Sequence, residues 1–403
     1  MPIAVLAVFA GLIGPVGAAR AGEPRHQVEL MTFSSGEHLF TSFGHTVVRI
    51  IDRERGTDQS YDWGTYDSSD PYLAPKFLVG KLQYWMDSQT TARALRRYEH
   101  QFGGAVSQEL FLSVSEVALL LEHIQQGLQP ENRYYAYHHF VDNCTTRVRD
   151  LFDDILGGAL REATEGHPAD GDTYRKLINA AMPTAPVARW LVYGLLNGLI
   201  DVPLDRWQRM FLPAYLMDEL DKLMIETPSG EIVPVVSRRE RLFGRAPAVP
   251  YPAPSLLPWV VLVIGVLFAT GWPGLVPRSR VGRIATGIVT TLWGLFGGFY
   301  GAIMVLGWCV APYPETKANL NLVAAHPLLL ALVVLGPLVA CGRPRAGRIV
   351  RSFLLLQGAV LLVALAARGL GLFVQQLEGF ALPALMAVAG TWWSLSRQRT
   401  AGS

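Results

Sequence analysis

The chain has 403 residues, half of them hydrophobic, and a formal net charge of +2, so it is long enough for two domains. Beyond Leu256 it carries ten Arg and one Lys against two Glu, a balance of +9, which leaves −7 for the part before. This asymmetry indicates an acidic globular part followed by a membrane part with basic loops. The positive charge falls in short turns between apolar runs and forms no basic patch, so nucleic acid is excluded as a partner.

The amino-terminal segment predicts export. Residues 3–19 are almost entirely apolar, and Ala19-Arg20-Ala21 has the small-x-small form of a cleavage site. We expect residues 1–21 to be a signal peptide or an N-terminal anchor. Residues 22–243 then form an exported domain.

Two β-rich runs, "VELMTFS" and "HTVVRII", open this domain. His45 begins the second run and shares a strand face with Val47 and Arg49. The next strand-like piece, "YDWG", offers Asp62. A histidine is matched to proton transfer at neutral pH, and a third polar group usually orients it. A lone histidine on a strand is, however, more often structural.

The run "YHHFVDNCTTRVRD" predicts a cysteine on the first turn of a helix. Asn143 is a suitable N-cap, and Gly157-Gly158 ends the segment. Apolar residues at helical spacing give the helix one buried stripe: Val148, Leu151, Phe152, Ile155 and Leu156. The helix dipole and nearby Arg147 both favour the thiolate form of Cys144. The alternative is a buried structural cysteine.

Cys144 is the one cysteine of the exported part, and Cys309 and Cys341 fall near opposite ends of apolar spans. A separation of roughly 30 Å excludes a disulfide between those two. An unpaired thiol in an oxidising compartment is a liability unless it has a use. No cysteine or histidine spacing is typical of a zinc site, so we expect no metal and no cofactor.

The rest of the exported domain predicts a helix from Ser113 to about Gln126, a loop at 161–186, and helices at about 187–200 and 205–226. A proline-rich linker follows at residues 244–258. Residues 256–398 hold five apolar spans, at about 256–272, 284–307, 325–341, 352–374 and 379–396.

Arginines cluster between spans one and two, between spans three and four, and after span five. By the positive-inside rule these loops are cytoplasmic, so the exported domain lies on the opposite side. The loop at residues 310–327 lies on the same outer side as Cys144. Its polar residues Asn319, Asn321 and His326 are candidates for binding a substrate head group or for docking the exported domain. The alternative is a solvated loop with a helix cap.

Four stretches, "SFGHTVVRI", "YDWGTYD", "FLVGKLQYWM" and "FVDNCTTRVRD", resemble the periplasmic domain of the Lnb-type lipoprotein N-acyltransferases of Gram-negative bacteria. The resemblance implies an α+β fold, with a permuted papain-like (cysteine–histidine) domain in the periplasm. An all-α five-helix transmembrane domain in the bacterial inner membrane would follow. It makes Cys144 the nucleophile and His45 its base. Asp62 stands where the family usually has an asparagine, so the third catalytic residue stays open.

The resemblance further implies transfer of an acyl chain from a lipid, through a thioester on Cys144, to the N-terminal lipidated cysteine of a lipoprotein. The partners would be this lipoprotein and a membrane phospholipid, with the donor left open between a separate phospholipid and the lipoprotein's own diacylglycerol. Asn143 and Arg147 join the three loop residues as expected substrate contacts. The alternatives are a papain-like cell-wall peptidase or amidase, and a non-enzymatic membrane scaffold with a structural Cys144.

Overall fold

A computed structural model describes residues 24–397 except 39–40, 68, 183–185, 228 and 250–279. The expected signal segment at 1–21, the linker from residue 250 onward and the first expected span at 256–272 lie outside the described residues.

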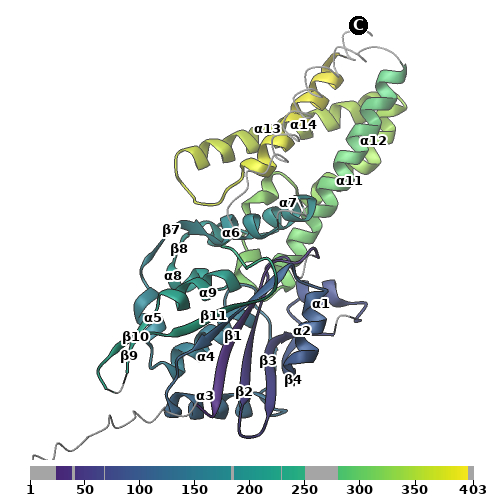
Figure 1. The fold of residues 1–403 in the computed structure, drawn as a ribbon. Helices are drawn as coiled ribbons and strands as arrows, with labels where there is room; N and C mark the ends of the chain where they lie inside the picture. Colours follow the sequence, from purple (N-terminus) through teal and green to yellow (C-terminus); the bar gives the residue numbers. More distant parts are fainter. Residues whose placement is uncertain are drawn as a thin grey trace, which may run out of the picture.

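A seven-stranded antiparallel sheet forms the centre of the exported domain, in the order β11-β5-β1-β2-β3-β4-β6 (Figure 1). Its strands are β1 (His26–Phe33), β2 (His45–Asp52), β3 (Thr57–Thr65), β4 (Gln83–Thr90), β5 (Gly104–Leu110), β6 (Tyr134–Ala136) and β11 (Val236–Gly244). The two β-rich runs are thus confirmed as β1 and β2, which pair so that Phe33 faces His45.

Both faces of the sheet are covered, so β1 and β2 are buried along most of their length. Leu30 and Val48 pack into the main core with α3 (Val114–Gly127), α4 (Cys144–Ile155) and α9 (Pro213–Lys222). Met31 and Val47 are the sequence neighbours of Leu30 and Val48. They point to the opposite face and pack under α2 (Thr91–Glu99). The alternation places His45, two residues before Val47, on the α2 side of β2.

The helix predicted from Ser113 is confirmed as α3, with a capping box between Ser113 and Glu116. The loop expected at 161–186 is wrong, because this stretch contains a helix, a strand and a second helix. The two long helices expected next are shorter, since Asn197 and Pro213 each begin a new element. The elements are α1 (Leu73–Leu78), α5 (Ala159–Thr164), β7 (Pro168–Thr173), α6 (Tyr174–Ala181), α7 (Pro186–Leu195), β8 (Pro203–Asp205), α8 (Arg206–Arg209), β9 (Met224–Glu226) and β10 (Ile232–Pro234).

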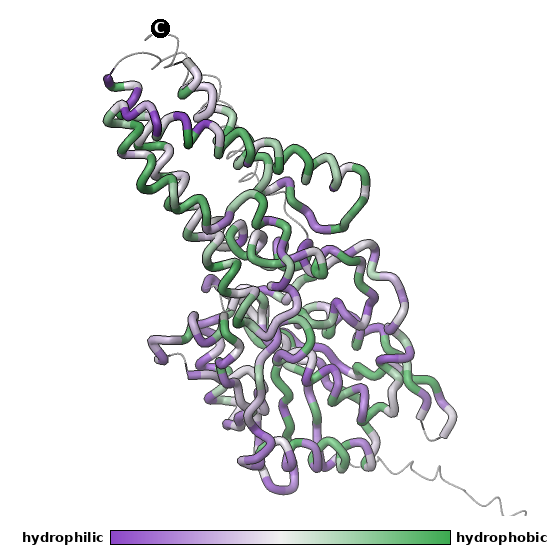
Figure 2. The backbone as a smooth tube through the Cα atoms, turned by 180° about the vertical axis from the view of Figure 1, so that it is seen from behind, coloured by the Kyte–Doolittle hydropathy of each residue, from purple (hydrophilic) through white to green (hydrophobic). Residues whose placement is uncertain are grey.

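The carboxyl-terminal part is helical and apolar, as the green backbone in Figure 2 shows. It comprises α11 (Arg280–Val310), α12 (Ala331–Ala340), α13 (Pro344–Gly369) and α14 (Glu378–Arg397). Among the described residues, α11 and α13 are long and apolar enough to cross a membrane. A third crossing is possible if Pro314–Val323 and Pro327–Ala340, bent by 50°, form one span. The structure therefore supports two or three spans and leaves the expected five unconfirmed.

The fourth expected span, 352–374, is displaced toward the amino terminus. Its helix α13 begins at Pro344 because proline suits a first helical position and arginine is a good helix former, so the basic run becomes the first turns of the helix. The helix ends at Gly369, shortly before Gly371 adopts a positive φ of 73°. Hydropathy alone marks the apolar stretch and misses these polar turns.

Candidate functional site

His45 is held at the start of β2, beside the end of β1. Gly44 precedes it with φ +79°, a conformation that favours glycine, and a Cβ there would lie 2.6 Å from the carbonyl oxygen of Phe33. The imidazole of His45 is buried and stacks on Phe102 with an interplanar angle of 7°. Its Nε2 lies 2.9 Å from Oδ1 of Asp62 on β3, which leaves Nδ1 for another partner.

Asp62 is 2% exposed, and protein donors reach both of its oxygens. The backbone N–H of Gly64 donates to Oδ1 over 2.6 Å. The hydroxyl of Tyr98, on α2, donates to Oδ2, and Nη2 of Arg97 lies 3.5 Å from the same oxygen. A buried carboxylate with this many donors is fixed in both orientation and charge.

Cys144 is the first residue of α4, as the sequence predicts. The side chain of Asn143 accepts hydrogen bonds from the backbone N–H groups of Thr145 and Thr146, and Thr146 completes a capping box. Thr145 Oγ1 also lies 3.1 Å from Thr46 Oγ1 on β2, which ties the start of the helix to the strand that begins with His45. The cysteine is free and partly exposed.

The three side chains converge on Gly64. A Cβ added at Gly64 would lie 2.6 Å from Cε1 of His45, 3.3 Å from Oδ1 of Asp62 and 3.3 Å from Cβ of Cys144. The structure therefore brings together the three residues that the sequence suggests as nucleophile, base and orienting group. They come from α4, β2 and β3.

The electrostatics of this cluster favour a charged imidazole. Burial opposes protonation of His45, but the carboxylate of Asp62 and the Cys144 side chain outweigh it and raise the pKa of His45 to about 10. Burial likewise opposes ionisation of Asp62, yet His45, Tyr98 and Gly64 together lower the pKa of Asp62 to about 2. A histidine between a carboxylate and a cysteine, where it can keep the thiol proton as an imidazolium, is the arrangement that activates a cysteine nucleophile.

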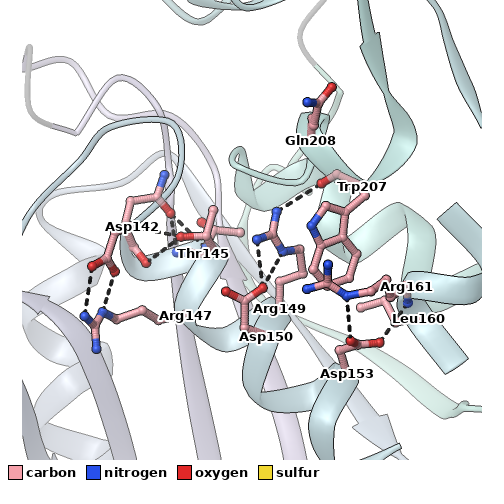
Figure 3. A network of polar contacts seen from close by, with 12 residues as sticks. Asp142, Thr145, Arg147, Arg149, Asp150, Asp153, Leu160, Arg161, Trp207 and Gln208 are labelled. Carbon is pink, nitrogen blue, oxygen red and sulfur yellow. Dashed lines mark hydrogen bonds and ion pairs between the residues drawn. The ribbon is translucent and has the colours of Figure 1, made fainter. Parts of the chain in front are cut away.

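The apolar stripe of α4 anchors the cysteine on the sheet: Val148 and Phe152 are fully buried. Arg149, on the same helix, donates to the carbonyl oxygen of Trp207, and Figure 3 shows the two side by side. Arg149 and Arg161 lie 4.0 Å and 4.1 Å from the centre of the Trp207 ring. These contacts fix the axis of α4, and therefore the direction in which its first turn points.

Asn143 and Arg147, expected to bind substrate, are occupied by contacts within the protein. The amide nitrogen of Asn143 donates to the carbonyl oxygens of His139 and Phe211, and its oxygen caps α4. Arg147 makes two hydrogen bonds to Asp142, drawn in Figure 3, and lies 3.8 Å from the centre of the Tyr135 ring. Both residues position the loop that carries Cys144.

The three outer-loop residues also make internal contacts. Asn319 and Asn321 are 3% and 1% exposed, and both donate to the carbonyl oxygen of Gly194 in α7. The imidazole of His326 lies beside Phe353 of α13. Of the two roles open for this loop, the geometry of the asparagines favours docking over head-group binding.

Other residues of the same loop reach the cysteine side of the domain. Tyr313 donates to the carbonyl oxygens of Phe77 and Tyr137, and Glu315 pairs with His138 at 3.4 Å. Tyr137 and His138 lie in the run that leads into Cys144. The membrane part therefore contacts the chain six or seven residues before the cysteine. Figure 1 shows α1 close to the end of α11 where this loop begins.

Sequence reasoning missed Tyr98, Gly64 and Tyr313. Tyr98 follows Asp62 by 36 positions on an amphipathic helix, and no local pattern links the two. Gly64 carried a signal, since a glycine inside a strand often marks a close approach of other groups. The docking of Tyr313 depends on tertiary structure alone.

Residues 23–180 match the family model of the Lnb N-terminal periplasmic domain. No curated protein and no solved structure matches the chain. The matched range contains all three residues that converge on Gly64, and the apolar helices follow it. The chain is thus a membrane protein with a periplasmic domain, and residues 23–180 belong to the family of Lnb N-terminal periplasmic domains.

Proposed function

We propose that this protein is a lipoprotein N-acyltransferase with a permuted papain-like site, located in the bacterial inner membrane. It transfers an acyl chain from a lipid to the α-amino group of a lipoprotein's N-terminal lipidated cysteine. The observation that carries the proposal is the convergence of Cys144, His45 and Asp62 around Gly64.

The reaction follows from these three side chains. His45 holds the thiol proton as an imidazolium, and the Cys144 sulfur, as the thiolate, attacks the carbonyl carbon of an acyl ester. The carbon–oxygen bond breaks, the thioester forms, and His45 returns the proton to the leaving alcohol. The nitrogen of the lipoprotein amine then attacks the thioester carbon, the amine proton passes to His45, and the carbon–sulfur bond breaks, which restores the pair of imidazolium and thiolate. Asp62 holds the imidazole in position and stabilises its charged form.

The oxyanion that forms in each half-reaction needs hydrogen-bond donors. The N–H groups of Thr145 and Thr146 already donate to Asn143, at 2.8 Å and 2.9 Å, so they are not free for this role. Because Asn143 occupies those two groups, the backbone N–H of Cys144 is the donor of the first turn that remains for the oxyanion. It belongs to the residue that makes the attack.

The contact between the membrane loop and the cysteine domain favours a lipid substrate over cell-wall peptide. Tyr313 and Glu315 follow α11 directly and bind next to the run that ends at Cys144. A peptidase of soluble fragments has no need of this contact. An enzyme whose acyl donor lies at the membrane surface needs the thiol held at that depth, because orientation supplies much of the rate.

The test is mass spectrometry of lipoprotein N-termini from cells that depend on this protein for N-acylation. We expect Cys144→Ala and His45→Ala each to leave the lipoprotein amine free while the protein remains folded in the membrane. Continued N-acylation with Cys144→Ala would refute the thioester mechanism. Release of soluble peptidoglycan fragments, lost in the same variant, would favour the peptidase. If neither product changes in Cys144→Ala, the remaining explanation is the non-enzymatic membrane scaffold.

A further inference from the structure

We propose that Tyr98 is a positioning residue of the cysteine–histidine site, acting through Asp62. Its hydroxyl holds the carboxylate in the rotamer that presents Oδ1 to His45 and keeps that carboxylate ionised. The site is then a four-residue chain, Tyr98–Asp62–His45–Cys144. This inference rests on the proposed cysteine chemistry but not on the identity of the acyl donor or acceptor.

The geometry of the two carboxylate oxygens carries the proposal. Oδ1 receives His45 Nε2 at 2.9 Å and the Gly64 N–H at 2.6 Å. Oδ2 receives the Tyr98 hydroxyl. A carboxylate rotates about one bond, so a fixed donor on Oδ2 also fixes the direction of Oδ1. Without that donor, the hydrogen bond between Asp62 and the imidazole has one less restraint.

Tyr98 is itself rigid, as a positioning residue must be. It is 1% exposed and packs against Phe33 and Phe102, with ring centres 4.7 Å and 5.8 Å away. Its own ring lies 5.4 Å from that of His45. Phenylalanine would fill the same space and keep these ring contacts, so Tyr98→Phe removes the hydroxyl alone.

Within the described part of the chain, the charged or titratable groups that face Asp62 come from four elements. His45 lies on β2, Arg97 and Tyr98 on α2, Cys144 on α4, and Tyr135 on β6. Arg97 is 42% exposed in its side chain and lies 3.5 Å from Oδ2, so water screens part of its charge. The buried hydroxyl of Tyr98 is therefore the firmer of the two contacts to Oδ2. Burial and the neighbouring Asp62 raise the pKa of Tyr98, so the hydroxyl keeps its proton.

The experiment measures the rate at which iodoacetamide alkylates Cys144 as a function of pH, in the full-length protein with Cys309→Ser and Cys341→Ser. In Tyr98→Phe we expect the acid limb of this profile to move to higher pH by about one unit, because a less well held Asp62 stabilises the imidazolium less. A shift of one pH unit corresponds to about 1.4 kcal/mol, which is of the size expected for one hydrogen bond to a charged group. Acyl transfer should fall about tenfold or more in kcat, with KM little changed.

The matched control is Tyr215→Phe, which removes a buried tyrosine hydroxyl from a different carboxylate, that of Asp172 at 3.1 Å. A loss of stability without an effect on the site should appear in both variants, whereas the shift of the acid limb should appear in Tyr98→Phe alone. An unmoved acid limb in Tyr98→Phe, or an equal shift in the control, overturns the inference. A shifted limb in a protein that transfers no acyl group supports the role of Tyr98 and refutes the proposed function instead.

Discussion

Replacing Gly64 by alanine tests whether the meeting point of the three site residues requires a residue without a side chain. The new Cβ would lie 2.6 Å from Cε1 of His45, whereas ordinary contacts begin at 3.4 Å, so the imidazole or the strand must move by roughly 0.8 Å. The imidazole of His45 is buried. Oδ1 of Asp62 and Cβ of Cys144 each lie 3.3 Å from the new Cβ, so the strand cannot relieve the contact by moving toward either of them. A misplacement near 1 Å costs on the order of 100-fold in rate.

We expect Gly64→Ala to lower both acyl transfer and the rate of Cys144 alkylation at neutral pH by about 100-fold. Crowding should cost about 1–3 kcal/mol of stability, partly offset by the better strand propensity of alanine. The assays are single-turnover acyl transfer, alkylation kinetics and thermal unfolding, all on the full-length protein. Thermal unfolding separates a displaced imidazole from an unfolded domain, because only a folded domain shows a cooperative transition.

The matched control is Gly347→Ala on α13, where a Cβ would have no neighbour within 4 Å. That variant should retain transfer, alkylation and thermal midpoint. Wild-type transfer by Gly64→Ala, together with an unaltered alkylation profile, would refute the reasoning. The three side chains would then not meet at Gly64 during the reaction.

Three other outcomes are expected. Asp62 and Cys144 overcome burial and raise the pKa of His45 from 6.5 to about 10, so the resulting stability is fully present below pH 6.5 and lost as pH rises through 10. Asp62→Asn should therefore flatten the fall in unfolding free energy across that range, as measured by denaturant titration at each pH; an unchanged slope would contradict the assigned charge pair. Cys144→Ser should transfer almost no acyl groups in the same single-turnover assay, because a serine hydroxyl is far less ionised, and near-normal transfer would contradict a thiolate mechanism. In Gly80→Ala, at φ +66°, the new Cβ would lie 2.2 Å from a ring carbon of Pro312, so transfer should fall while Cys144 alkylation persists; equal losses of both would mean that the loop contact supports the fold of the site as a whole.

The local elements of this protein follow from its sequence. Two β-rich runs predict β1 and β2, and Asn143 with a helical apolar stripe predicts that Cys144 begins a helix. Such signals are short-range: a cap acts within one turn, and a strand alternates with a period of two residues. They identify Cys144 and His45 as candidates and offer Asp62 on the next strand.

Tertiary structure alone decided which side chains meet. Asp62 reaches His45 because β2 and β3 pair, and Tyr98 reaches Asp62 because α2 packs on that face of the sheet. Asn319 illustrates the opposite case. Its polar side chain in an outer loop suggests a contact with substrate, but the fold buries it. A buried amide must satisfy its hydrogen bonds within the protein, and Asn319 does so by donating to the carbonyl oxygen of Gly194. A sequence shows which groups are available, whereas burial and long-range contact determine whether each one acts on a substrate or on its own chain.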